Sequence, residues 1–299
     1  GKSNAMSFVR CDEPVCTESQ AGIELLIEPR TRDIGAFEVS RVLPTARRRM
    51  VGPFIFFDEM GPATMKPGDA MSVRPHPHIN LATVSYLFEG SIMHRDSTGA
   101  AQVIEPGAIN WMVAGHGIAH SERSPEETVD SERRLHGIQL WVALPEEHEE
   151  TEPAFHHHPA DSLPAWSEDG VEVRLLLGEA FGRTSPVPVF SDMLYLDVRL
   201  GRGASWQLPD TAERAVYVVS GELTIAGETV AAKTMAVLGS GSSVATASAD
   251  ARLMVIGGEP IGGQPLTQAG RFTTLALMIG GLTVFGMFVA TVSATMVSR

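Results

Sequence analysis

Two histidines stand one residue apart in RPHPHINLATVSYLFEG, at the start of a segment typical of a β-strand. A second pair, His120 and Glu122, has the same spacing in NWMVAGHGIAHSER. Side chains two positions apart on a strand point to the same face. If both faces line one barrel, His76, His78, His120 and Glu122 supply three imidazoles and one carboxylate. This mixed nitrogen and oxygen set suits a divalent transition metal with positions left open for a substrate. No thiolate accompanies it, which argues against copper(I) or structural zinc.

The remaining histidines are interpreted as structural or solvated. His94 is expected to be a structural histidine, with a place in the pocket lining as the alternative. His116, in a loop flanked by glycines, is expected to be solvated, with a place at the entrance as the alternative. Consecutive strand positions alternate between faces, so His156, His157 and His158 are assigned to the surface of a linker. Five apolar residues are expected in the core, one or two of them also forming an aromatic wall around the metal: Phe54, Phe56, Phe57, Trp111 and Met112.

The elements that must position these residues are short strands. Apolar segments recur between glycine, proline, aspartate and asparagine, whereas helical periodicity is scarce before residue 272. This pattern predicts an all-β protein. Strands are expected over ten segments: 35–43, 82–90, 91–96, 109–114, 135–144, 171–178, 193–200, 214–221, 222–227 and 252–258.

The two halves of the chain resemble each other. VSYLFEGSIMHRDSTG aligns with AVYVVSGELTIAGETV, so that Tyr86 matches Tyr217 and Gly90 matches Gly221. The repeat predicts two tandem, jelly-roll-like β-barrels. No histidine follows His158, so the second barrel has no imidazole to offer. The resulting division is an N-terminal arm (1–21), a metal-binding barrel (22–150), a linker (151–164), a barrel without metal ligands (165–262) and an apolar tail (263–299).

Charge and composition limit the classes of partner. The net charge of −13 disfavours direct binding of nucleic acid. Two cysteines, Cys11 and Cys16, are interpreted as reduced thiols, and the protein is expected in the cytoplasm. Residues 272–298 carry no charge and are long enough to span a membrane as a helix. They are expected either to anchor the protein to a membrane by its tail or to form a buried helix or an oligomer contact.

Four stretches together resemble the pirin family, whose members are built from two cupin barrels. They are GPFIFFDEMGPA, RPHPHINLATVSYLFEGSIMHRDSTG, PGAINWMVAGHGIAHSE and HGIQLWVALP. The resemblance covers most of residues 22–262. It implies a metal held by the H-x-H and H-x-E pairs already singled out, usually iron, although nickel, manganese, cobalt or copper also suit these ligands. Ala82 stands where the family's HPHxGxE pattern has glutamate. That glutamate is not one of the four ligands, so the departure puts in doubt only its role beside the ligands or in the pocket. The apolar tail also departs from the family.

The resemblance implies two alternative functions. The first is a dioxygenase of the quercetin 2,3-dioxygenase type, which opens an enolic, flavonol-like aromatic ring with O2 and releases carbon monoxide. In this mechanism Glu122 is the catalytic residue and accepts the hydroxyl proton. The second is a regulator that binds protein partners and responds to the redox state of its metal.

Overall fold

The computed structural model describes residues 14–18, 22–33, 37–239, 241 and 243–261. Within these ranges the chain forms β-strands and three single-turn 3-10 helices, and no α-helix. The predicted all-β class is therefore confirmed. The short helices are η1 (Glu126–Thr128), η2 (Glu146–His148) and η3 (Ala160–Ser162).

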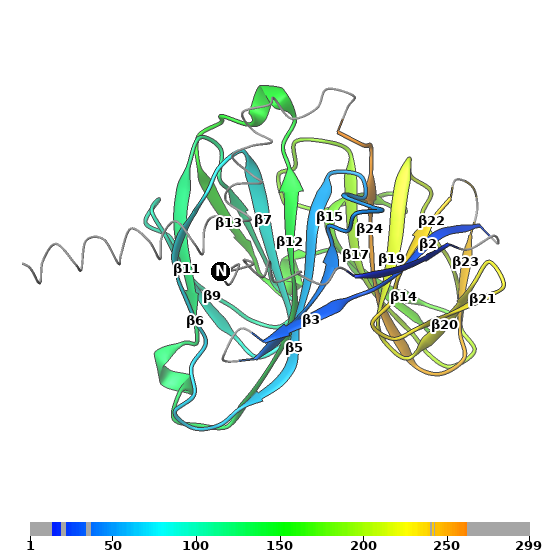
Figure 1. Cartoon of the computed structure of the whole chain (residues 1–299), viewed down its shortest axis with the longest axis horizontal. Helices are drawn as coiled ribbons and strands as arrows, with labels where there is room; N and C mark the ends of the chain where they lie inside the picture. The colour runs from blue at the N-terminus through cyan, green and yellow to red at the C-terminus, as the bar shows by residue number, and fades with distance from the viewer. Residues whose placement is uncertain (1–13, 19–21, 34–36, 240, 242, 262–299) are drawn as a thin grey trace, which may run out of the picture. The chain divides into compact units, whose positions relative to one another are not determined.

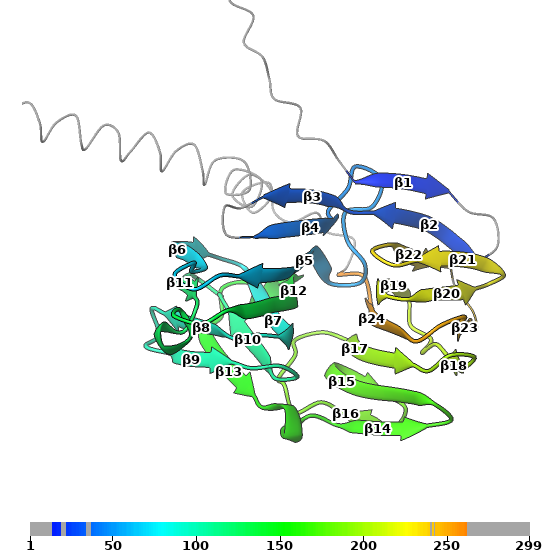
Figure 2. The same ribbon diagram turned by 90° about the horizontal axis from the view of Figure 1, so that it is seen from below.

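Two antiparallel sheets build the N-terminal cupin (Figures 1 and 2). One sheet has the order β13-β10-β7-β12-β5-β4-β3, and the other has the order β6-β11-β8-β9. The strands of the first sheet are β3 (Arg30–Asp33), β4 (Glu38–Leu43), β5 (Phe54–Met65), β7 (Leu81–Glu89), β10 (Ile109–Val113), β12 (Arg133–Ala143) and β13 (Ala154–His158). Those of the second are β6 (Ser72–His78), β8 (Ile92–Asp96), β9 (Ala101–Ile104) and β11 (Ile118–Arg123).

The C-terminal cupin repeats this arrangement. Its large sheet has the order β1-β2-β22-β19-β24-β17-β15-β14, with β16 paired to β15, and its small sheet has the order β18-β23-β20-β21. The large sheet contains β1 (Val15–Glu18), β2 (Ile23–Glu28), β14 (Ala165–Glu168), β15 (Val171–Ala180), β16 (Arg183–Thr184), β17 (Met193–Leu200), β19 (Glu213–Ser220), β22 (Met235–Leu238) and β24 (Ala251–Gly258). The small sheet contains β18 (Ser205–Gln207), β20 (Glu222–Ile225), β21 (Glu228–Ala231) and β23 (Val244–Ala247).

The central strands of the large sheets are buried on both faces. On β7, Val84 and Tyr86 belong to a hydrophobic cluster that also contains Tyr195 and Tyr217 of the C-terminal cupin. Ser85, between them, points to the opposite face because strand side chains alternate. The two cupins therefore share one core between their large sheets, and the other face of each large sheet is available to its own barrel interior.

Two reciprocal hydrogen bonds cross this shared core. The hydroxyl of Tyr86 donates to Asp197 of the C-terminal cupin at 2.7 Å, and that of Tyr217 donates to Glu59 of the N-terminal cupin at 2.6 Å. Burial and the neighbouring carboxylate raise the pKa of each tyrosine above its ordinary value. Since Tyr86 and Tyr217 occupy matching positions of the sequence repeat, the predicted repeat is also a repeat of the interface.

Strand pairing departs from the predicted domain boundaries at two places. The strand β2, which the prediction assigned to the N-terminal barrel, pairs with β22 in the C-terminal cupin. The strand β13 lies in the predicted linker and pairs with β10 in the N-terminal cupin. An alternating strand can bury its apolar face on any open sheet edge of suitable register. Its own sequence therefore does not reveal which barrel it completes.

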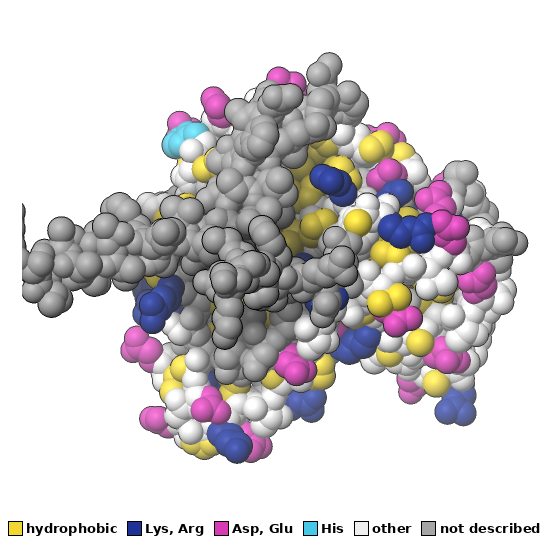
Figure 3. Space-filling model, viewed as in Figure 1, with side chains coloured by type: hydrophobic (Ala, Val, Ile, Leu, Met, Phe, Trp, Pro, Cys, Tyr) yellow, Lys and Arg dark blue, Asp and Glu magenta, His cyan; other side chains and the backbone are white. Residues whose placement is uncertain are grey.

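Charged side chains of both signs are interspersed on the face presented in Figure 3. An ion pair joins the two cupins: Arg48 pairs with Glu213 at 3.1 Å, and the same carboxylate accepts the backbone N–H of Gly52 at 2.8 Å. Among the residues described, no helix is long and apolar enough to cross a membrane. The segment 272–298, for which a membrane contact was predicted, lies outside them.

Candidate metal centre

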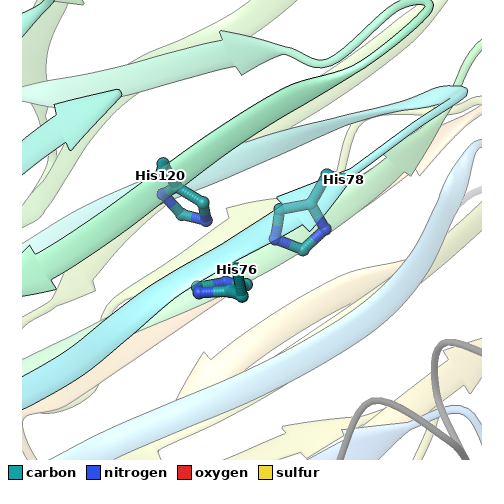
Figure 4. Close-up of side chains that lie close together, drawn as sticks. All are labelled: His76, His78 and His120. Carbon is teal, nitrogen blue, oxygen red and sulfur yellow. The ribbon is translucent and has the colours of Figure 1, made fainter. Parts of the chain in front are cut away.

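Neighbouring strands of the small N-terminal sheet carry the predicted donors. His76 and His78 lie on β6, and His120 lies on β11, directly opposite His76 in the antiparallel register. Pro77, between the two β6 histidines, lacks a backbone N–H and is tolerated there because β6 is the edge strand of its sheet. Alternation turns both β6 histidines to one face, and the rings gather with that of His120 (Figure 4).

The three imidazoles are close enough to share one ion. One donor atom from each of His76, His78 and His120 lies within 4.8 Å of the others. The ring centroids are separated by 4.9 Å between His76 and His78, 4.4 Å between His76 and His120, and 5.0 Å between His78 and His120. The Nδ1 atom of His76 is 2.9 Å from the carbonyl of Arg74, a second contact of the kind that orients metal-binding histidines.

Burial keeps two of these imidazoles neutral. Only 7% of His78 and 2% of His120 is exposed. Desolvation, followed by repulsion from His76, lowers the pKa of His78 from 6.5 to about 3. Desolvation, followed by repulsion from His76, His78 and His94, lowers the pKa of His120 to about 2. A metal ligand must be the neutral imidazole, so the fold holds both rings in the form that binds.

The fourth predicted donor, Glu122, belongs to a second group that overlaps the first. A register shift separates His120 from Glu122 along β11, so Glu122 faces Val73 of β6 and pairs with His94 of β8 on its other side. Bulges of this kind bend a strand and redirect its side chains. One donor atom from each of Glu122, His94 and His120 lies within 4.8 Å of the others. The four predicted donors are thus divided between two groups. His76 and His78 belong to one group, Glu122 belongs with His94 to the other, and His120 belongs to both.

The carboxylate of Glu122 is held from the large sheet. The Gln139 amide donates to both of its oxygens at 3.0 Å, and the Ser85 hydroxyl donates to one of them at 3.3 Å. Gln139 and Ser85 face each other on β12 and β7. The carboxylate is buried, and Gln139 and Ser85 are both neutral donors, so neither of them competes with a cation for it.

The residues present fit a metal ion. Both ring nitrogens of His120 are buried without a hydrogen-bond partner. Buried polar atoms are rarely left unpaired, and each one calls for an explanation. A cation at the centre of the three imidazoles would give at least one of these nitrogens a partner. Nitrogen and oxygen donors without thiolate suit a divalent transition ion.

An aromatic wall stands beside the imidazoles. The rings of Trp141 and His78 meet edge to face with centroids 5.1 Å apart, and Trp141 stacks on Phe56 at 4.3 Å and 13°. The Arg41 guanidinium covers the other side of Phe56, 4.4 Å from its centroid. Phe56 was among the candidates for this wall. Trp141 was missed, because in sequence it is one apolar residue in a buried strand.

The C-terminal cupin replaces the polar cluster with apolar side chains. Counting from the matched tyrosines, Ser85 corresponds to Val216 and His94 to Ile225. In the strand pairing, Gln139 lies opposite Ser85 and Val255 lies opposite Val216, so Gln139 corresponds to Val255. In the same way, Glu122 lies opposite His94 and Ala245 lies opposite Ile225, so Glu122 corresponds to Ala245. These four replacements are fully buried or nearly so.

A guanidinium lies where the C-terminal cupin would hold an ion. Arg214, which corresponds to Thr83, is 1% exposed. It donates to Ser243, the match of His120, at 3.3 Å, and lies 3.5 Å from the carboxylate of Asp210. It also donates to the carbonyls of Pro209 at 2.7 Å and of Gly241. A buried cation therefore ties together the loop after β18 and the loop between β22 and β23.

The structure separates the other histidines. His116 is exposed and contacts Glu152 at 3.2 Å. His156, His157 and His158 alternate along β13, with the Nδ1 atom of His157 2.7 Å from Asn110. His94, interpreted from sequence as structural, is the one that joins the donors. Asp96, two residues after it, gives the same spacing as the other two pairs, but only the pairing of β8 with β11 shows that His94 lies beside Glu122.

Comparisons with known proteins agree with this architecture. The family model described as pirin matches residues 36–142, and that of the pirin C-terminal cupin domain matches residues 195–274. A pirin-like protein of Caulobacter vibrioides is 47% identical over 246 residues, which cover 80% of this chain and 85% of that protein. A Pseudomonas aeruginosa protein named "Putative quercetin 2,3-dioxygenase" is 39% identical, covering 85% of this chain and 82% of that one.

A solved structure gives the same result for the fold. The crystal structure of a quercetin 2,3-dioxygenase from Acinetobacter baumannii matches with a TM-score of 0.73 and 35% identity, covering 79% of each chain. Sequence repeat, paired sheets and homology all identify two cupin domains in tandem. The chain belongs to the pirin family.

Proposed function

We propose that this protein is a metal-dependent dioxygenase of the quercetin 2,3-dioxygenase type, acting on an enolic, flavonol-like aromatic compound with O2. The observation that carries the proposal is His120, a buried imidazole with two unpartnered nitrogens beside two further imidazoles and a carboxylate. The names of two similar proteins, one 39% and one 35% identical, support the choice of substrate class.

His76, His78, His120 and Glu122 would hold a divalent transition ion, for which we propose iron. When bound, such an ion lowers the pKa of a hydroxyl group that reaches it and stabilises the resulting anion. The neutral imidazoles leave the positive charge of the ion largely uncompensated, which favours an anionic substrate.

The side chains of the protein would orient the substrate and receive its proton. The Trp141 and Phe56 rings form a rigid stack beside His78, and a planar aromatic substrate can lie against such a surface. Glu122 would accept the proton of the enolic hydroxyl, since Gln139 and Ser85 hold its carboxylate in place. The overall reaction inserts both atoms of O2 into the ring and releases carbon monoxide.

Oxygen uptake with quercetin tests the proposal directly. The metal-free protein is loaded separately with iron, nickel or manganese, and metal content is measured before each assay. We expect turnover that depends on the metal, that is lost in His120→Asn, and that persists in His116→Asn, which changes an exposed histidine outside the donor groups. Rates no higher than those of the metal-free protein with every metal would refute the dioxygenase assignment.

A further inference from the structure

His94 is a buried histidine to which the proposed reaction gives no role. Only 4% of it is exposed, and it lies opposite Glu122 in the pairing of β8 with β11. Its ring stacks on Phe155 of β13 with centroids 4.3 Å apart and an angle of 14° between the planes. The ring is therefore fixed at the side of the donor cluster away from β6.

A second set of donors forms around this ring. His94, His120 and Glu122 are all buried, and one donor atom from each lies within 4.8 Å of the others. An imidazole carries its two nitrogens at different positions of the ring, and each can bind a metal. If one nitrogen of His120 binds an ion together with His76 and His78, the other nitrogen of His120 stays buried without a partner. The neutral ring has a single nitrogen lone pair, so this second nitrogen binds an ion only in the other tautomer, and the two positions are alternatives.

The surroundings of His94 are those of a metal-binding histidine. Its Nε2 atom is 2.8 Å from a carboxylate oxygen of Asp96, whose side chain is wholly buried. The other oxygen of Asp96 accepts hydrogen bonds from the backbone N–H and the hydroxyl of Thr98, at 2.8 and 2.6 Å, so the carboxylate cannot turn away. Metal-ligating histidines commonly donate their outer N–H to a carboxylate in this way. Nδ1 of His94 then remains free to coordinate.

The fold itself does not require this polar group. In the C-terminal cupin, Ile225 takes the place of His94 and Ala245 that of Glu122, and both are fully buried in an apolar core. The same strand pairing is thus stable with hydrocarbon side chains. Without a cation, the two buried nitrogens of His120 at the centre of this group have no partner, and such burial costs free energy.

We propose that His94, His120 and Glu122 form a second cation position for a divalent transition ion, which overlaps the first position and shares His120 with it. This inference rests on the metal centre of the proposed function but concerns residues outside the family's H-x-H pair. Asp96 is the positioning residue, because it fixes His94 without contacting the ion.

Co²⁺ binding to a variant without the β6 histidines tests the proposal. In His76→Ala/His78→Ala only the second group is intact. We expect this variant to bind one Co²⁺ per chain, detected by its visible absorption and by calorimetry. A further His94→Gln substitution should abolish that binding, and Asp96→Asn should weaken it by about 10–100-fold. His116→Gln in the same background is the matched control and should change nothing.

The outcomes separate this proposal from the previous one. If the wild-type protein binds no Co²⁺, the metal centre itself is wrong. If the wild-type protein binds Co²⁺ but the double variant binds no more than the triple variant with His94→Gln, only the second position is wrong. Should the double variant fail to fold by circular dichroism, the more conservative His76→Gln/His78→Gln variant, crystallised with excess Co²⁺, decides the question. An anomalous-difference peak at coordination distance from His94 supports the position, and its absence overturns it.

Discussion

Acidification should destabilise the metal-free protein well before its carboxylates titrate. His78 and His120 are almost fully buried, and their pKa values fall from 6.5 to about 3 and about 2, mainly through desolvation. In the unfolded chain both rings regain the ordinary pKa of 6.5. As the pH falls below that value, these two rings bind protons in the unfolded state but not in the folded state.

The sign and size of the effect follow from this difference. For a histidine whose folded pKa is depressed, the stability contribution is fully present above pH 6.5 and is lost as the pH falls toward the folded value. One pH unit corresponds to about 1.4 kcal/mol for each such group. Between pH 7.5 and pH 5, each histidine therefore removes about 2 kcal/mol from the free energy of unfolding, and the pair removes about 4 kcal/mol.

Urea unfolding of the metal-free protein at pH 7.5, 6.5 and 5 measures this loss. We expect a small fall of about 0.7 kcal/mol between the first two values, because the unfolded rings are half protonated at pH 6.5, and a total fall of about 4 kcal/mol by pH 5. Asparagine cannot titrate, so His78→Asn and His120→Asn should each lose about half as much, and the double variant almost nothing. His116→Asn, changed at an exposed site, should behave as the wild type. An equal loss in the wild type and the double variant would show that the buried imidazoles are not responsible.

Three further changes test other parts of the reasoning. Glu122→Gln should lower kcat at least about 100-fold per bound metal, because the proton acceptor is lost; oxygen uptake on protein of measured metal content checks this, and an unchanged kcat contradicts it. Tyr217→Phe should reduce the free energy of unfolding by about 1.5–3 kcal/mol, because buried Glu59 loses a short hydrogen bond; urea denaturation measures it. Arg214→Met should reduce the free energy of unfolding by about 1–3 kcal/mol, because the carbonyl of half-buried Pro209 loses its donor; urea denaturation measures it. Metal content should not change in that variant, and a fall in it would contradict the separation of the two cupins' roles.

The alternating strands and the two spaced pairs could be predicted from the sequence because both signals are local. A period of two residues fixes which side chains share a face, so His76 and His78 were placed together correctly. The repeat around Tyr86 and Tyr217 was also visible, since each strand of a duplicated domain must fill the same kind of core.

Features that depend on pairing between distant strands could not be predicted in the same way. The register shift after His120 places Glu122 opposite Val73 of β6, and the pairing with β8 places it opposite His94; the sequence of β11 predicts neither neighbour. His94 and Trp141 gain their positions only from the strands beside them. Arg214 would be expected on the surface from its residue type, yet the carbonyls of two loops bury it.

The two cupins show that one framework has two ways of filling the same interior. Thr83, Ser85 and Gln139 line the N-terminal barrel with neutral polar groups, whereas Arg214, Val216 and Val255 stand at the matching positions of the C-terminal barrel. The buried guanidinium donates hydrogen bonds to the carbonyls that face it, and the two valines are buried at the neighbouring positions. Among the described residues of the N-terminal barrel, the matching position holds the neutral Thr83, and His120 retains two unpartnered nitrogens. We therefore expect the N-terminal barrel to take up its positive charge from solution. This difference, rather than the number of histidines, makes the N-terminal barrel the one that is built to bind an ion.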